Sequence, residues 1–438
     1  MTPASNDRFL EALDVTPLGP AHRRLFVIVG AGLLVDSLDI FIVSGISSAL
    51  LHQGLASLTQ LSHLAAASAF GMALGALCGG VLGDRFGRRL IILVGSAVIM
   101  AGAAACAAAP SIETLIAARF VTALGLGVEN VLAYGILIEF LPLRARGTWM
   151  TALALIATCA APLALIMNYF VAPLPGGWRL LFATVAALSA VALTLRFALP
   201  ESARWLAARG YFDRAKDVVT RFAPQMPISD AAGEPSEKGA AAPAHFGSET
   251  IVRLGVAGLL NVGLVVATFG FVSWLPTFFA EEGRELPSAL LKTTIITLGA
   301  PVGVVIGLIV ADRSERKWTT VVSAVAAAAA GVTYALAPAP ALVPLGFLVV
   351  VTIYAFGAVG VTAYMPELFA TPIRMRAVGF AISMGRFAAI VIPIATVSIF
   401  QRSGQAGVVM ALAVALLIVA FVVAYFGVRT RDKPLDAI

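Results

Sequence analysis

Charged side chains are scarce in this chain. Of its 438 residues only 12% are Asp, Glu, Lys or Arg, whereas 60% are hydrophobic and the mean hydropathy is +0.94. A soluble globular domain carries roughly 25% charged residues, so this chain has too few to cover a surface that faces water. The composition therefore excludes a soluble protein and predicts an integral membrane protein.

Cysteine and histidine are also sparse, and this excludes several kinds of chemistry. The three cysteines, Cys78, Cys106 and Cys159, lie in apolar runs and are expected to be buried thiols. The four histidines are scattered without the spacing of metal ligands. No Gly-rich phosphate loop ending in Lys-Ser or Lys-Thr occurs, and no nucleophile lies in a pattern with a base. We therefore expect no metal, no cofactor, no nucleic-acid partner and no enzyme activity.

Long apolar runs are what the chain has in abundance. A helix needs about 20 apolar residues to cross a bilayer, and twelve runs approach or exceed that length. The runs in the first half are 25–48, 63–82, 90–109, 112–140, 148–170 and 178–199. Those in the second half are 251–278, 290–311, 318–337, 342–364, 373–400 and 404–427. The predicted fold is an all-α membrane protein with twelve transmembrane helices in two six-helix halves.

The polar segments divide the chain and orient it. Residues 1–24 are predicted to be an N-terminal tail, 25–199 and 251–427 the two halves, 200–250 a linker and 428–438 a C-terminal tail. Within the linker, 201–222 has an amphipathic helical pattern. If both tails and the linker share one side, that side carries 22 Lys and Arg residues against 4 opposite. Because Lys and Arg gather in cytoplasmic loops, we expect both termini to be cytoplasmic, in the cell's inner membrane.

Charges between the predicted helices recur at a fixed spacing. Asp84-Arg85 follows the second run, and Asp312-Arg313 follows the eighth run 228 residues later. Glu139 and Glu367 share that spacing, which predicts an internal repeat, as in transporters whose halves rock about a central site. The alternative is a generic basic loop beside a membrane helix. The residues predicted to form a cytoplasmic gate and conformational switch are Gly83, Asp84, Arg85, Gly87, Arg88, Arg89, Glu139, Arg144, Arg146, Asp312, Arg313, Glu367, Arg374 and Arg376.

The motif from Gly83 to Arg89, with its second copy and the six-plus-six layout, resembles the major facilitator superfamily. The stretches 119–147 and 199–206 resemble its sugar-porter-like branch. Asp36-Ser37-Leu38-Asp39 is similar to the Asp-Gly-Phe-Asp of aromatic-acid/proton symporters and of niacin and synaptic-vesicle-protein-like transporters. The resemblance implies a secondary active transporter, expected to be monomeric, that carries a small organic anion with protons by alternating access. The alternatives are a sugar or polyol porter, or an uncoupled facilitator.

Charges inside the predicted membrane helices indicate where chemistry occurs. A charged side chain at mid-bilayer is costly, so each one is a functional hypothesis. Asp36, Asp39 and Glu129 are predicted to couple protons. Arg386 is predicted to bind the substrate, because a guanidinium holds a carboxylate bidentately. The alternatives are structural ion pairs or interhelical hydrogen bonds, including a pair between Arg386 and either aspartate.

Deep polar and aromatic residues complete the predicted substrate site. Besides Arg386, these are Asn130, Tyr134, Asn261 and Tyr354. Trp178, Trp274 and Trp318 are instead predicted to lie at the membrane interfaces, where tryptophan is enriched.

Overall fold

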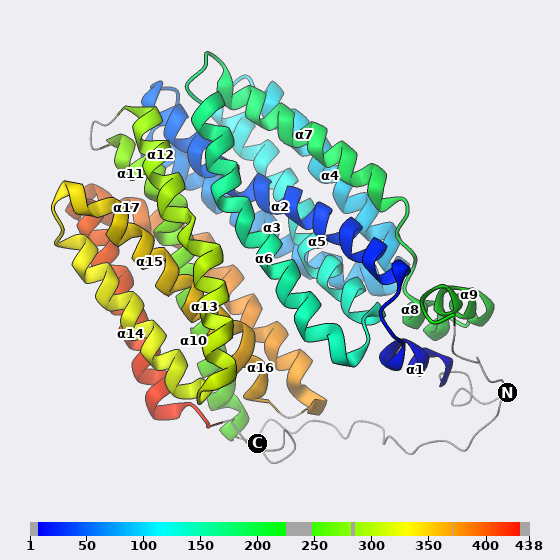
Figure 1. The fold of residues 1–438 in the computed structure, drawn as a ribbon. Coiled ribbons are helices and arrows are strands. Elements are labelled where there is room, and N and C mark those ends of the chain that lie inside the picture. Colours follow the sequence, from blue (N-terminus) through cyan, green and yellow to red (C-terminus); the bar gives the residue numbers. More distant parts are fainter. Residues whose placement is uncertain (1–7, 225–247, 282–284, 370, 430–438) are drawn as a thin grey trace.

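Two helical bundles lie side by side in the structure (Figure 1). The computed structural model describes residues 8–224, 248–281, 285–369 and 371–429, and the regular structure in these ranges is helical throughout. The first bundle consists of α2 (Pro20–His52), α3 (Leu58–Phe86), α4 (Arg88–Ala108), α5 (Ile112–Phe140), α6 (Leu143–Val171) and α7 (Gly177–Arg196). Each of these helices covers all or most of one of the first six predicted runs, and α2, α3 and α6 extend beyond theirs.

The second bundle has more interruptions. It contains α10 (Ser248–Gly270), η2 (Val272–Trp274), α11 (Leu275–Glu281), α12 (Leu286–Thr297), α13 (Gly299–Arg313), α14 (Arg316–Ala335), η3 (Ala339–Ala341), α15 (Leu342–Phe356), η4 (Gly357–Tyr364), α16 (Met365–Glu367) and α17 (Thr371–Phe426). The predicted seventh helix is thus broken by the 3-10 turn η2, and the tenth by the π-helix η4. Such breaks are frequent at functional sites.

The count of membrane-spanning helices agrees with the prediction. Eleven helices of the described chain are long and apolar enough to cross a bilayer. One of them, α17, has 56 residues and joins two predicted spans across a kink at Gly404, where φ is 63°. Glycine adopts this left-handed backbone without steric cost. The structure therefore contains twelve spans.

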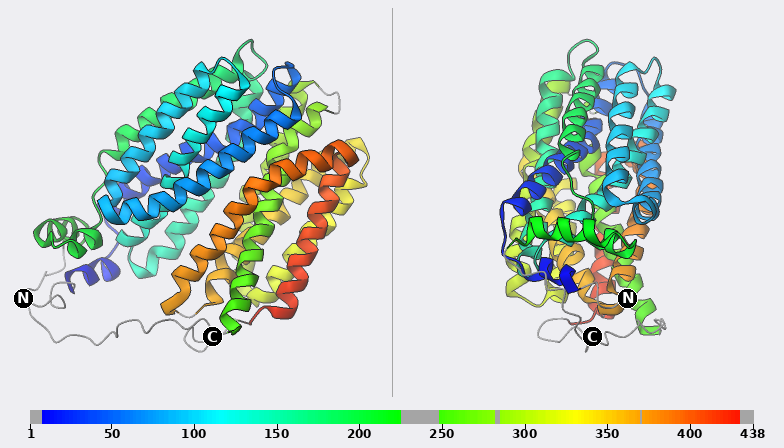
Figure 2. Two further views of the ribbon diagram at one scale, coloured as in Figure 1. Left: turned by 180° about the vertical axis from the view of Figure 1, so that it is seen from behind. Right: turned by 90° about the vertical axis from the view of Figure 1, so that its right-hand side faces the viewer.

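Three short helices pack at one end of the first bundle, which we call the linker end (Figure 2). They are α1 (Arg8–Val15), α8 (Ala203–Ala208) and α9 (Phe212–Phe222). The amphipathic pattern of the linker predicts α8 and α9, whereas α1 lies in the segment predicted as a polar tail. It forms because Phe9, Leu10 and Leu13 are buried in the same hydrophobic cluster as α9.

The bundles are joined at the opposite end, which we call the loop end. A hydrophobic cluster there combines residues of both bundles, including Ile46 of α2 and Phe278 of α11. The Ser48 hydroxyl also donates to the Pro276 carbonyl at 3.0 Å. Toward the linker end each bundle has a hydrophobic cluster of its own, and the two ribbons diverge (Figure 2). This arrangement is closed at the loop end.

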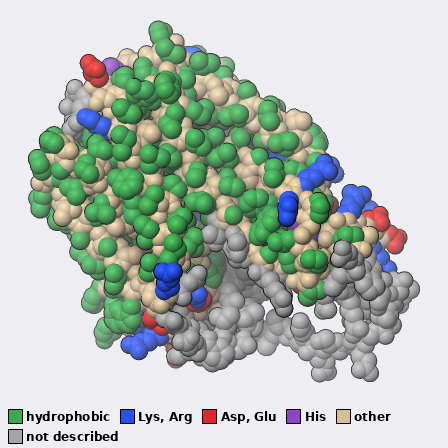
Figure 3. Space-filling view, in the orientation of Figure 1, with side chains coloured by type: hydrophobic (Ala, Val, Ile, Leu, Met, Phe, Trp, Pro, Cys, Tyr) green, Lys and Arg blue, Asp and Glu red, His purple; other side chains and the backbone are tan. Residues whose placement is uncertain are grey.

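The surface agrees with insertion in a membrane. Apolar side chains cover the middle of the face shown in Figure 3, and charged side chains gather toward its two ends. Such an apolar band is expected for helices that contact lipid.

Candidate functional site

A cavity lies between the two bundles. Its walls come from α2, α3 and α5 of the first bundle and from α10, η2, α11 and α17 of the second. The polar lining consists of five hydroxyl side chains and two arginines, namely Ser44, Ser47, Ser68, Ser273, Thr277, Arg119 and Arg386. Apolar and aromatic side chains, including Phe269 and Trp274, make up the remainder. Apolar walls with a few polar groups are typical of a small-molecule site.

One wall of the cavity contains a buried ion pair. The Nη1 atom of Arg119 donates to both carboxylate oxygens of Asp39, each at 2.8 Å. The side chains are 2% and 0% exposed, so each charge depends on the other for compensation. Asp39 itself does not line the cavity, and Arg119 separates it from the open space.

A second cluster of charges lies within the first bundle. At the end of α7, the Nη2 atom of Arg196 lies 3.0 Å from Asp36 Oδ2, and the same atom contacts Glu129 Oε2. Its Nη1 atom donates to the Ser96 hydroxyl at 2.7 Å, and that hydroxyl lies 2.5 Å from Glu129 Oε1. Sequence reasoning assigned neither Arg196 nor Ser96 to the site. Both residues belong to the site only because their helices pack with these side chains toward Asp36 and Glu129.

Arg386 is the cation that the second bundle presents to the cavity. Its Nη2 atom donates to the Asn130 side-chain oxygen at 2.7 Å, across the boundary between the bundles. Tyr134, one helical turn beyond Asn130, lies close enough to interact with the same charge. Among the described residues, no carboxylate lies within ion-pairing distance of Arg386. The expected alternative, a pair with Asp36 or Asp39, does not form, because both aspartates contact arginines of their own bundle.

Other predicted cavity residues lie elsewhere. Tyr354 belongs to the partly buried rim of the second bundle's core and packs beside Gly303 of α13, away from the cavity lining. Asn261 packs against Gly385, the neighbour of Arg386, without lining the cavity itself. The prediction of an interfacial position for Trp274 is wrong, because this side chain is 4% exposed and forms part of the cavity wall. Trp178 is likewise buried, whereas Trp318 is exposed.

The duplicated charges at the linker end form matching ion pairs. In the first bundle, Arg88 of α4 contacts Glu139 of α5, and it also lies 3.6 Å from Asp84. In the second bundle, Arg316 of α14 contacts Glu367 of α16. Arg316 stands 228 residues after Arg88, the spacing of the repeat. Sequence reasoning missed it, although that spacing could have identified it. Each pair lies within one bundle, so neither ties the bundles together in this conformation.

The remaining predicted gate residues are less informative. Arg85 is exposed, with its guanidinium 5.2 Å from the Phe86 ring centre, and Arg313 is also exposed. Gly83 packs against Leu132 of α5. The side chains of Arg144, Arg146, Asp312, Arg374 and Arg376 lie outside the described part of the structure.

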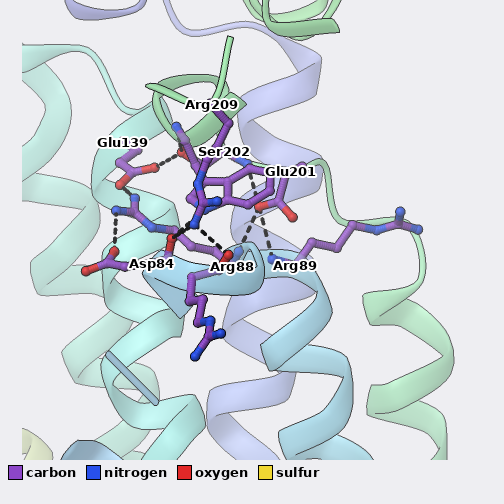
Figure 4. A network of polar contacts seen from close by, with 9 residues as sticks. Asp84, Arg88, Arg89, Glu139, Glu201, Ser202 and Arg209 are labelled. Carbon is purple, nitrogen blue, oxygen red and sulfur yellow. Dashed lines mark hydrogen bonds and ion pairs between the residues drawn. The ribbon is translucent and has the colours of Figure 1, made fainter. Parts of the chain in front are cut away.

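The linker helix α8 is bound to the α3–α4 turn by a network that Figure 4 shows. Glu201 Oε1 accepts hydrogen bonds from the backbone N–H groups of Arg88 and Arg89, at 2.9 and 3.2 Å, and so neutralises the N-terminus of α4. Arg209 donates to the Asp84 and Arg85 carbonyls at the C-terminus of α3.

The turn itself depends on Gly87. Its φ is 101°, a conformation that favours glycine, and a Cβ atom there would lie 2.5 Å from Glu201 Oε2. The Ser202 hydroxyl contacts Glu139, so the linker helix and the Arg88–Glu139 pair form one assembly. This assembly positions the turn against the first bundle.

Comparison with known proteins is consistent with this geometry. The family model described as "Sugar (and other) transporter" matches residues 44–438. The niacin transporter NiaP of Acinetobacter baylyi is 27% identical over 436 residues, covering 97% of this chain and 98% of its own. The 4-hydroxybenzoate transporter PcaK of Pseudomonas aeruginosa is 30% identical over 302 residues, covering 66% and 65%.

A solved structure shares the fold. The xylose transporter XylE from E. coli, in a partially occluded inward open conformation, superposes with a TM-score of 0.75 at 19% identity. The match covers 95% of this chain and all of that chain.

Proposed function

The chain belongs to the sugar (and other) transporter family of the major facilitator superfamily, and from this premise we propose that it carries a small organic anion together with a proton. Membership of this family implies that the chain is a membrane transporter of metabolites. The observation that supports an anion is Arg386, a cation that reaches the cavity from α17 without an acidic partner among the described residues. A guanidinium in such a setting favours a ligand that supplies the missing carboxylate.

The cavity wall is suited to an aromatic or heteroaromatic monocarboxylate. Phe269 and Trp274 offer apolar surface for a ring, and the serine and threonine hydroxyls can bind a ring nitrogen or a phenolic hydroxyl. The printed names of the relatives, a niacin transporter and a 4-hydroxybenzoate transporter, support this class. In this proposal Arg386 binds the carboxylate, and Asn130 and Tyr134 orient Arg386.

The count of central charges supports proton coupling. Three acids and three arginines lie in the middle of the two bundles, namely Asp36, Asp39, Glu129, Arg119, Arg196 and Arg386. The set is neutral when all six are ionised, and a bound monocarboxylate adds one negative charge. Because uncompensated charge is costly in a low-dielectric interior, uptake of one proton by an acid restores neutrality. The balance therefore favours a ratio of one proton to one anion.

Alternating access would use the charges at the linker end. The halves 25–199 and 251–427 are taken to rock about the cavity, with the linker 200–250 and both termini on the cytoplasmic side. The Arg88–Glu139 and Arg316–Glu367 pairs lie within separate bundles while the loop end is closed. We infer that these charges reach across to the other bundle when the linker end closes, which makes them a switch between states.

Uptake into proteoliposomes tests the proposal. Purified protein should accumulate radiolabelled nicotinate or 4-hydroxybenzoate when the outside is acidic, and accumulate less without a pH gradient. The cavity's five hydroxyls also suit a sugar, so labelled xylose is the matched neutral solute. Xylose uptake without carboxylate uptake would overturn the proposal in favour of a sugar porter. Carboxylate uptake that does not depend on the pH gradient would indicate an uncoupled facilitator.

A further inference from the structure

Two buried carboxylates share one guanidinium in the first bundle. The Nη2 atom of Arg196 contacts Asp36 and Glu129 together, and these three side chains are 4%, 7% and 0% exposed. Ser96 bridges the other side, with its hydroxyl between Arg196 Nη1 and Glu129 Oε1. Four helices, α2, α4, α5 and α7, contribute one side chain each, so the cluster is a built site and not a chance contact on one helix.

The helices leave room for this cluster through missing side chains. A Cβ atom on Gly32 of α2 would lie 2.1 Å from Arg196 Nη2, so the guanidinium occupies the space of the absent side chain. Gly32 stands one helical turn before Asp36, on the same face of α2. A Cβ on Gly95 of α4 would likewise press on the Glu129 side chain at 3.1 Å. The packing thus brings the cation between both acids.

The charges of the cluster do not balance. Asp36 and Glu129 supply two negative charges when ionised, and Arg196 supplies one positive charge. The neighbouring pair, Asp39 and Arg119, balances itself. In the described chain no further Lys, Arg or His contacts either carboxylate of the cluster. Like charges held together in a buried site cannot both stay ionised at low cost, and one of them takes up a proton.

We propose that Asp36 and Glu129, joined through Arg196, are the site that binds the coupling proton, and that Asp39 stays ionised as the fixed partner of Arg119. The coupling role rests on the proposed function, whereas the binding of a proton rests on the geometry alone. When a carboxylate oxygen of the pair binds a proton, one O–H bond forms and the cluster becomes neutral. When the proton returns to water on the other side, that bond breaks and one negative charge is restored.

One helix, α5, connects the site of the anion to this pair. Asn130, which binds Arg386, directly follows Glu129 in α5. While the cavity is empty, the positive charge of Arg386 offsets the one extra negative charge of the cluster in the sum of the six central charges. A carboxylate bound to Arg386 removes that compensation, so the pair then favours the proton. Anion and proton therefore bind together, which is the requirement of symport.

Infrared spectroscopy of the purified full-length protein tests the proton site without any substrate. Spectra recorded against pH should contain a carbonyl band of a protonated carboxylic acid that vanishes as the pH rises. Glu129→Gln and Asp36→Asn should each abolish the band completely, because the remaining acid then has Arg196 to itself. Asp39→Asn should keep the band, and so should the control Asp213→Asn at an exposed position of α9. A band that persists in both cluster variants, or that disappears only in Asp39→Asn, would overturn the inference.

A milder variant covers the case in which loss of an acid impairs folding. Ser96→Ala retains both carboxyls and removes a hydroxyl that lies 2.5 Å from Glu129. Because that contact favours the ionised form, the band should extend to higher pH in this variant. An unchanged midpoint would contradict the assignment of the proton to Glu129.

Transport assays distinguish a failure of this inference from a failure of the proposed function. In proteoliposomes Glu129→Gln should still exchange labelled nicotinate or 4-hydroxybenzoate across the membrane. The accumulation driven by a pH gradient should fall at least tenfold in this variant. Accumulation equal to that of the wild type would refute the coupling role of the pair. If the wild-type protein itself accumulates neither carboxylate, the proposed function fails, whereas the infrared result still decides whether the pair binds a proton.

Discussion

Replacing Arg386 with glutamine is the most direct test of the anion site. The wild-type guanidinium is held by Asn130 at 2.7 Å and lacks a carboxylate partner among the described residues. A substrate carboxylate would therefore form a new charge-assisted contact without first breaking an ion pair. Hydrogen bonds to charged groups contribute about 1.5–3 kcal/mol net. At about 1.4 kcal/mol per factor of ten, Arg386→Gln should weaken binding by roughly 10- to 150-fold.

Two further variants make the magnitude interpretable. Arg386→Lys keeps the charge but loses the planar fork, so its affinity should lie between the wild type and Arg386→Gln. Asn130→Ala removes only the group that orients the guanidinium and should cost about 0.5–1.5 kcal/mol. That range corresponds to roughly 2- to 12-fold in the dissociation constant.

The assay is calorimetric titration of the purified variants with nicotinate and 4-hydroxybenzoate. Arg402→Gln is the matched control, because Arg402 is an exposed arginine in the same element, α17. This control should bind as the wild type does. If Arg386→Gln binds either carboxylate with unchanged affinity, the argument that the unpaired guanidinium recognises the anion is refuted.

Three further predictions concern packing, charge and switching. Gly32→Ala places a methyl group 2.1 Å from the Arg196 guanidinium and should destabilise the protein by about 1–3 kcal/mol, which would lower the thermal unfolding midpoint. Gly135→Ala is the control, because a Cβ atom there meets no other side chain within 4 Å, and equal midpoints for the two variants would contradict the packing argument. Asp39→Asn leaves Arg119 buried without a counter-charge and should cost about 3–5 kcal/mol, and adding Arg119→Gln should recover part of that loss; a double variant less stable than the single one would count against the pair. Arg88→Gln should lower the maximal uptake rate roughly fivefold, as expected for a shift of about 1 kcal/mol in the balance of states, with binding affinity unchanged; weaker binding at an unchanged rate would exclude a role in switching.

The sequence predicts the helices well because their signal is local. Length and apolar composition are sufficient to find a membrane span, and the twelve runs correspond to the spans of the structure. The interruptions were not predicted, since the π-helix at 357–364 is as apolar as an ordinary span. The helix Arg8–Val15 was also missed, because its stability comes from burial against α9 and not from its own eight residues.

The site was predictable only in part, for a different physical reason. Asp36, Asp39, Glu129 and Arg386 stand out because charge is rare in membrane helices. The structure places the three acids beside arginines within the first bundle, and Arg386 at the boundary between the bundles. Their partners could not be read from the sequence. Asp39 contacts an arginine 80 residues away, and Asp36 one that is 160 residues away. Such contacts depend on which helix faces pack together, and the sequence does not specify this. For the same reason Tyr354 was wrongly predicted to line the cavity, whereas it packs against α13.

The internal repeat divides the charges into two groups with different roles. The switch charges obey the spacing of 228, since Arg88 and Glu139 recur as Arg316 and Glu367 with the same contact. The central acids do not recur, because the positions 228 residues after Asp36, Asp39 and Glu129 are Leu264, Ala267 and Gly357. Both halves must move, so both need a switch. A proton and an anion need only one site each, and the first bundle supplies the acids while the second supplies Arg386. Coupling then depends on contact across the boundary, which the hydrogen bond from Arg386 to Asn130 provides.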